Sequence, residues 1–199
     1  MKSTDVVSGD LLASSERIID SFTRHGCMLG LSESVTGGTI ASCLARVDGC
    51  SKILFASQVL YSIYGKSSFL ELDAKKIEAA GTVSEFIIDA MNDCMARRFF
   101  DLQKQQGGEP PENEPRGFIA LAICGVAGSA IENLPSGTVI IGMDVYNDIT
   151  GEIDMTKLAR HQVEWFHFDG DRTRIILDAT RTALSWLDGV PFISTGNNI

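Results

Sequence analysis

Residues 30–66 read GLSESVTGGTIASCLARVDGCSKILFASQVLYSIYGK, and this stretch decides how the rest of the chain is arranged. A polar glycine turn at 34–38 follows an apolar segment and opens a helical pattern. The first N–H groups of a helix have no partner within the helix, so such a turn is a place to hold an anion. Ser51 follows in a second turn, and Tyr61 and Lys66 close the stretch. A serine–lysine hydrolase needs side chains of these types.

The composition is that of a soluble globular protein. The 199 residues suffice for one sizeable domain, and 44% are hydrophobic while 22% are charged. The formal net charge of −9 would repel a phosphate backbone, so we expect no nucleic-acid partner. A few local donors can still hold one small anionic ligand.

Neither a disulfide framework, a metal site nor a membrane segment is predicted. The cysteines are odd in number, scattered and without a C-x-x-C pair, which is typical of reduced thiols in a cytosolic protein. Only three histidines occur, none in H-x-x-x-H spacing, so we expect neither a metal nor a cofactor. The first ten residues are polar and unlike a signal peptide, and no apolar run approaches the roughly 20 residues of a membrane span. We therefore expect a cytoplasmic protein.

Hydrophobic periodicity predicts helices that alternate with buried strands along most of the chain. Strands are expected over residues 27–31, 53–61, 118–124, 137–145 and 158–168. Helices are expected over residues 11–25, 37–47, 73–80, 85–100 and from a cap at 169–171 to about 187. The pattern predicts one three-layer α/β/α sandwich with a mixed, mostly parallel sheet and a core of about 11–187. We read 101–117 as a loop insertion, 147–152 as a hairpin turn and 188–199 as a tail.

Three places could bind a substrate through backbone or side-chain donors. The first is the turn with Ser34, Thr36, Gly37 and Gly38, although such a turn is more often an ordinary helix cap. The second is Cys124 with Gly125, which could form a backbone nest or merely a tight turn. The third is Arg172, which could pair with a phosphate or lie at the surface.

Ser51 and Lys66 are the candidate nucleophile and base. A serine hydroxyl is weak until a base takes its proton, and a lysine can do so only when it is uncharged. The two residues flank one expected strand, so the chain must fold back after Gly65 or the residues must meet across a subunit interface. A turn serine and a solvated lysine are the simpler alternative. Cys50 is a rival nucleophile, with no histidine near it in the sequence.

Several segments together resemble the C-terminal domain of CinA-type proteins (competence/damage-inducible protein A). The family pattern E-S-C-T-G-G appears as residues 33–38, G-S-S as 49–51 and Y-S-N-E-A-K as 61–66. G-x-V-S-E is intact at 81–85, and the T-G-I-A-G-P turn resembles 124–129. P-x-G-T-V and G-D-R match 135–139 and 170–172. These segments keep the family order across nearly the whole chain, so we expect 1–199 to be one domain of this type.

The resemblance implies a nicotinamide-nucleotide amidase. Such an enzyme hydrolyses the carboxamide of nicotinamide mononucleotide to nicotinic acid mononucleotide and ammonia. It further implies that Ser51 is the nucleophile, that Lys66 is its base and that Tyr61 assists them. Substrate contacts would come from the binding residues named above, which are Ser34, Thr36, Gly37, Gly38, Cys124, Gly125 and Arg172. We expect a small nucleotide as the substrate and a homo-oligomer as the assembly.

The chain departs from the family pattern near the expected site. Val35 replaces the usual cysteine, Ile63 the usual asparagine, and Cys124 a usual threonine or serine. These changes leave Ser51 and Lys66 in place but could reshape the site. Two alternatives therefore stay open, namely a binding or regulatory protein without turnover and an amidase for another small amide.

Overall fold

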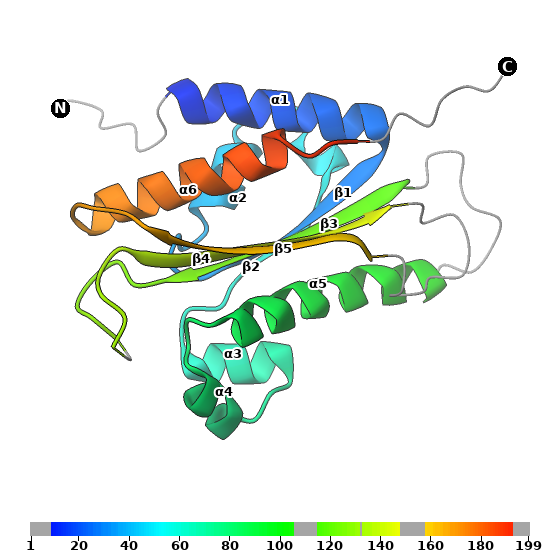
Figure 1. The fold of residues 1–199 in the computed structure, drawn as a ribbon. Coiled ribbons are helices and arrows are strands. Elements are labelled where there is room, and N and C mark those ends of the chain that lie inside the picture. The colour runs from blue at the N-terminus through cyan, green and yellow to red at the C-terminus, as the bar shows by residue number, and fades with distance from the viewer. Residues whose placement is uncertain (1–8, 106–114, 132, 148–157, 193–199) are drawn as a thin grey trace, which may run out of the picture.

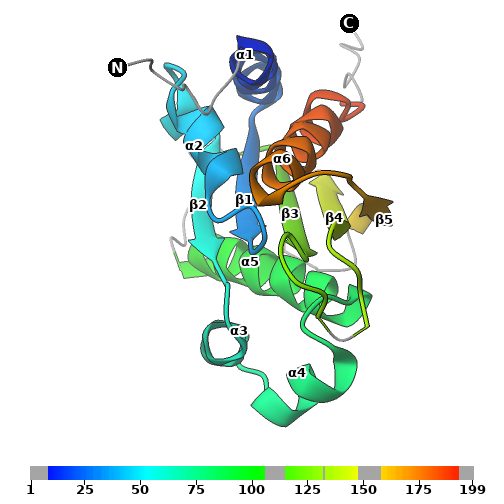
Figure 2. The same ribbon diagram turned by 90° about the vertical axis from the view of Figure 1, so that its left-hand side faces the viewer.

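A five-stranded sheet forms the centre of the computed structural model, which describes residues 9–105, 115–131, 133–147 and 158–192. The strand order is β2-β1-β3-β4-β5, so β2 and β5 are the two edges (Figure 2). The strands are β1 (Cys27–Glu33), β2 (Leu54–Val59), β3 (Gly117–Gly125), β4 (Thr138–Asn147) and β5 (Leu158–His167). β1 and β3 are buried almost throughout, which explains the continuous apolar sequence of β3 and of the first part of β1.

The sheet is mixed, as predicted, but it is not mostly parallel. β1 pairs in parallel with β2 and with β3, whereas β4 pairs antiparallel with both β3 and β5. The antiparallel half arises because no helix separates β3, β4 and β5 among the described residues. A chain without a crossover helix returns antiparallel to the strand it has just left.

Helices cover both faces of the sheet (Figure 1). α1, α2 and α6 lie on one face, and α5 lies on the other with α3 and α4 beside it. The helices are α1 (Gly9–His25), α2 (Thr39–Ala45), α3 (Ile63–Leu70), α4 (Ala74–Ala80), α5 (Glu85–Gln105) and α6 (Arg172–Asp188). Each long helix buries one apolar stripe, for example Leu11, Ile18, Ile19 and Phe22 of α1.

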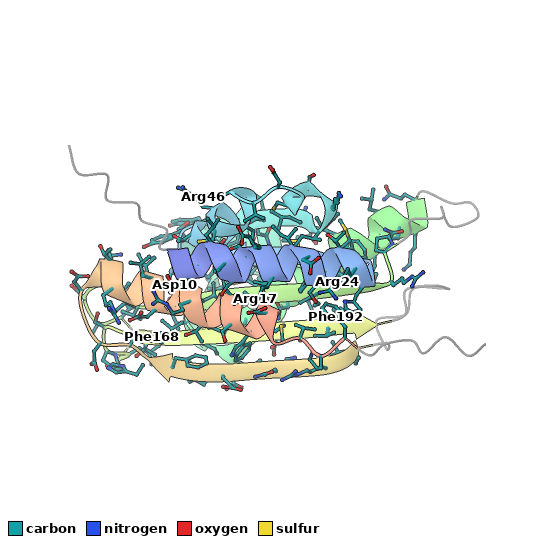
Figure 3. All side chains as sticks on the ribbon, turned by 90° about the horizontal axis from the view of Figure 1, so that it is seen from above. Asp10, Arg17, Arg24, Arg46, Phe168 and Phe192 are labelled. Atoms are coloured by element: carbon teal, nitrogen blue, oxygen red, sulfur yellow. The ribbon has the colours of Figure 1, made fainter. Side chains whose placement is uncertain are left out.

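Two ion pairs join the neighbouring helices α1 and α6. Arg17 Nη2 lies 2.7 Å from Asp188 Oδ2, and Arg181 Nε lies 2.9 Å from Asp10 Oδ2. Figure 3 shows Asp10 and Arg17 on the part of α1 next to α6. All four groups are at least partly exposed, so these pairs add little to the burial of apolar surface between the helices.

The largest difference from the sequence prediction is α3, which periodicity did not reveal. Ser62 begins this helix, and its hydroxyl accepts a hydrogen bond from the Gly65 N–H at 3.0 Å. The helix turns the chain back just after β2. The sequence analysis expected such a turn after Gly65, as one way to bring Lys66 to Ser51. In addition, 101–105 of the predicted loop continue α5, whereas 106–114 and the predicted turn from 148 onward lie outside the described residues.

No helix in the described ranges combines the length and apolarity needed to cross a membrane.

Candidate active site

The carboxyl ends of the parallel strands meet at the point where the chain changes direction across the sheet. From β1 the chain moves to β2 on one side, and it later returns to β3 on the other side of β1. The intervening helices lie on opposite faces, since α2 packs on one and α3 to α5 on the other. In open α/β sheets ligands bind beside such a switch point. Ser34 is the first residue after β1 and therefore lies there.

Ser34 is paired with Lys66. Lys66 Nζ lies 3.1 Å from Ser34 Oγ and 2.8 Å from the carbonyl oxygen of Leu60. Only 7% of Ser34 and 2% of Lys66 are exposed to solvent. α3 produces this contact because it carries the lysine side chain back over the end of β2. Lys66 takes part in none of the ion pairs within the described ranges.

Cys124, at the end of β3, lies behind Ser34. It is fully buried, and its thiol is 3.5 Å from the Met91 sulfur. Burial raises the pKa of the Cys124 thiol, while the nearby Lys66 charge and a hydrogen bond with Ser34 oppose this rise. The thiol therefore stays protonated at neutral pH and is a poor nucleophile. Cys124 is thus buried next to Ser34, and the prediction that it contacts the substrate stays a prediction.

Tyr61 and Arg172 form the exposed side of the site. Arg172 Nη1 donates to the Tyr61 hydroxyl at 3.3 Å, although the residues are 111 positions apart. Arg172 also lies against Gly128, where an added Cβ would come within 2.3 Å of its Nη2 atom. A larger residue at position 128 would therefore displace the guanidinium from its present position. The sequence singled out Tyr61 and Arg172, but it gave Gly128 no role beyond a turn.

The turn at 36–38 does not offer the predicted anion site. The buried carboxylate of Glu33 accepts hydrogen bonds from the N–H groups of Gly38 (3.0 Å), Ile40 (3.2 Å) and Ala41 (2.9 Å). It also accepts one from the Thr36 hydroxyl at 2.7 Å. The carboxylate of Glu33 therefore occupies the start of α2, so the predicted anion site there is wrong. Substrate contacts through Thr36, Gly37 and Gly38 stay a prediction. The signal was present in the sequence, because Glu33 directly precedes the turn.

Ser51 is far from Lys66 within the chain, so the two residues do not meet inside one subunit as one of the two predicted routes required. The other predicted route, a contact across a subunit interface, stays a prediction. Ser51 is exposed in a short 3-10 helix, Cys50–Lys52, that precedes β2. Lys66 follows the other end of β2, and a strand of six residues spans about 20 Å. Cys50 shares the location of Ser51 and has its pKa raised by burial, so the rival nucleophile is no better placed.

Gly125 belongs to the sheet rather than to an open nest. It lies opposite Val139 at the end of the β3–β4 ladder, and the next N–H, that of Val126, donates to Thr138 O at 2.8 Å. An added Cβ at Gly125 would lie 2.8 Å from that same carbonyl oxygen. The glycine is therefore needed for close strand pairing. Its predicted role in substrate binding stays a prediction.

Within the described residues, no group of three or more His, Cys, Asp or Glu side chains is arranged to hold a metal ion.

Comparison with known proteins identifies the family. Residues 12–101 match the family model of the CinA C-terminal domain. The crystal structure of competence/damage inducible protein CihA from Agrobacterium tumefaciens is similar, with a TM-score of 0.69 at 26% identity. That similarity covers 90% of this chain and 94% of the other. Residues 12–101 belong to the CinA C-terminal domain family.

One further solved structure has a similar fold, and a further relative is similar over part of the sequence. A CinA superfamily protein from Escherichia coli has a TM-score of 0.62 at 23% identity, over 94% of this chain and 91% of that one. A competence-damage inducible protein of Streptococcus pneumoniae is 29% identical over 127 residues, which are 63% of this chain. The match takes in only 27% of the length of that relative.

Proposed function

We propose that this CinA domain hydrolyses the carboxamide of nicotinamide mononucleotide, with Ser34 as the nucleophile and Lys66 as the base. The observation that carries the proposal is the 3.1 Å contact between Lys66 Nζ and Ser34 Oγ in a buried setting. It retains the serine–lysine chemistry expected from the family resemblance and transfers the nucleophile from Ser51 to Ser34. A base within hydrogen-bond reach of the hydroxyl is the geometry that nucleophilic catalysis needs.

The first step forms a tetrahedral adduct between Ser34 and the amide carbon. After Lys66 has lost one proton to solvent, its amine accepts the Ser34 proton as the hydroxyl oxygen attacks the amide carbon, and Leu60 O continues to hold the amine in place. Oxygen charge then develops on the former carbonyl. No described residue accepts a hydrogen bond from the N–H of Val35 or Thr36, so these two groups next to Ser34 are our candidate oxyanion donors. Such donors contribute roughly 3–4 kcal/mol each where they have been tested.

The second step returns the proton and releases the products. Lys66 gives the proton to the amide nitrogen, so that ammonia leaves and Ser34 carries the acyl group. A water molecule, deprotonated by Lys66, then cleaves the ester and restores the serine. Arg172 and Tyr61 lie on the exposed side, where Arg172 can bind the phosphate of the nucleotide. Such a remote contact holds the amide in position for attack.

The decisive experiment compares two serine variants. Purified wild type, Ser34→Ala and Ser51→Ala are incubated with nicotinamide mononucleotide, and ammonia and nicotinic acid mononucleotide are measured. We expect Ser34→Ala to lose turnover and Ser51→Ala to keep it, with both variants folded. The reverse pattern would restore Ser51 as nucleophile. Binding without turnover by the wild type would favour the regulatory alternative, and turnover of other amides alone would favour a different amidase substrate.

A further inference from the structure

The outer edge of β5 carries a charge pattern that is complementary to itself. β5 pairs with β4 on one side and is the last strand of the described sheet on the other. Figure 3 shows it bordering the molecule. Arg160, Gln162 and Glu164 alternate along the strand and therefore share one face. Along the strand, Arg160 donates to Gln162 Oε1, and Gln162 Nε2 donates to Glu164 Oε1 at 2.6 Å.

We propose that β5 pairs antiparallel with β5 of a second copy of this chain, centred on Gln162. Around that centre, Arg160 of each copy faces Glu164 of the other, and the two Gln162 side chains face each other. Directly opposed residues of unlike charge stabilise an antiparallel pair. One residue further along the strand, a centre at Val163 would place Arg160 opposite Phe166 and leave the charges unmatched. The charge pattern thus favours a second copy of this chain as the partner and a register centred on Gln162.

The shape of β5 suits this pairing. The strand has an extra residue at Ala159, because Val145 pairs with Arg160 while Tyr146 pairs with Leu158. The regular part of the edge therefore begins at Arg160, where the proposed pairing begins. An isologous contact of this kind closes on itself as a dimer.

The opposite edge of the sheet lacks such a pattern. β2 has the sequence LFASQV and carries no charged residue. An unpaired edge strand is a template for another chain, so β2 is the rival surface for the second copy. The β5 proposal is independent of the amidase proposal, because it concerns assembly and is tested without a substrate.

Charge reversal tests the pairing. Wild type, Arg160→Glu, Glu164→Arg and the double variant are compared by sedimentation, with Glu16→Arg on the exposed face of α1 as the control for charge. We expect the wild type to have twice the chain mass of 21.5 kDa. Each single reversal should raise the dissociation constant at least about tenfold, because two attractions become two repulsions. The double variant and the control should associate as the wild type does.

A cysteine variant tests the register. Opposed residues of an antiparallel pair have a Cα separation of about 4.5–5.5 Å, within the range of a disulfide. All five native cysteines are buried, so Gln162→Cys should cross-link copies under mild oxidation and Ser57→Cys on β2 should not. A monomeric wild type, a dimer that neither reversal weakens, a double variant that does not recover, or cross-linking through Ser57→Cys would each overturn the proposal. Circular dichroism and melting temperatures establish that every variant is folded.

Discussion

Lys66 Nζ and Ser34 Oγ lie 3.1 Å apart although 32 residues separate them in the chain. The contact depends on two separate features of the fold. β1 delivers Ser34 to the switch point of the sheet, and α3 turns the lysine back toward it. On the buried side of this contact lies Cys124, whereas Tyr61 and Arg172 lie on its solvent-exposed side. The proposed acyl transfer uses this arrangement, with Ser34 as the nucleophile, Lys66 as the base and Arg172 as the substrate contact.

The first prediction concerns the base. Lys66→Arg keeps a positive side chain but cannot act as a base, since a guanidinium does not lose its proton in proteins. Lys66→Met keeps the length and removes the amine. We expect both variants to lower kcat by about 10²- to 10⁴-fold, which is the usual contribution of general acid–base catalysis. Ammonia release from nicotinamide mononucleotide is the measurement.

The control for the base is structural. Lys66→Met should remain folded, because methionine suits a buried site and its melting temperature can be compared with that of the wild type. An Arg variant with normal turnover would exclude Lys66 as the base. A Met variant that is unfolded would leave the Arg variant as the informative one.

The second prediction concerns the contact between the Arg172 guanidinium and Gly128. Gly128→Ala places a methyl group where the guanidinium now lies, at 2.3 Å from Nη2. The arginine must move, so we expect this variant to behave like Arg172→Ala. Both should raise KM for the nucleotide about tenfold or more, because one charged phosphate contact is lost. A steady-state titration of substrate checks this result.

A matched glycine separates this effect from general disturbance of the fold. An added Cβ at Gly9 meets no atom within 4 Å, so Gly9→Ala should leave KM unchanged. If Gly128→Ala alters stability but not KM, then Arg172 does not bind the substrate from its present position.

The sequence predicted the elements better than their contacts. The long helices and all five strands lie near their predicted positions, because burial of an apolar face has a clear period. α3 escaped notice because Gly65 and Lys66 interrupt its apolar pattern, although Ser62 is a typical helix cap. Without α3, the sequence did not show how the chain folds back to bring Lys66 to the end of the sheet.

The site was only half predictable for the same reason. Motif matching supplied Ser34, Tyr61, Lys66 and Arg172, but it did not show which serine meets the lysine. β1 and β2 are parallel, so Ser34 after β1 and Lys66 after β2 lie at the same end of the sheet, whereas Ser51 precedes β2 and lies at the other end. This is a property of topology rather than of spacing. Glu33 was likewise quoted within a motif, yet only coordinates show its carboxylate at the start of α2.

The third prediction concerns Glu33, whose carboxylate replaces an external anion. Glu33→Ala removes the acceptor of four hydrogen bonds and leaves buried donors unpaired. A hydrogen bond to a charged group contributes about 1.5–3 kcal/mol, so the free energy of unfolding should fall by at least about 2 kcal/mol. Urea denaturation measures the change. The exposed Glu16→Ala should stay within about 0.5 kcal/mol of the wild type, and an equal loss in both variants would contradict the role of Glu33.

The fourth prediction concerns the pH dependence of stability near His161. Its Nδ1 lies 2.7 Å from Asp144 Oδ1, and its Nε2 lies 3.9 Å from Asp89 Oδ1 on α5. The hydrogen bond to Asp144 is the main cause that raises the pKa of His161, with Asp89 and Asp93 adding their charges. Burial raises the pKa of Asp144 as well, and His161 opposes that rise.

The sign of the effect follows from these directions. A histidine whose folded pKa is raised stabilises the fold fully below its unfolded value of about 6.5, and this stabilisation is lost as the pH rises through the folded value. The raised pKa of Asp144 acts in the same direction, but from about pH 4 upward. The free energy of unfolding should therefore fall as the pH rises above about 6.5, and His161→Gln should flatten this fall. Urea titrations at a series of pH values and one protein concentration measure the slope, with His167→Gln on the same strand as the control. Parallel slopes for the wild type and His161→Gln would show that the contact between His161 and Asp144 does not govern stability in this range.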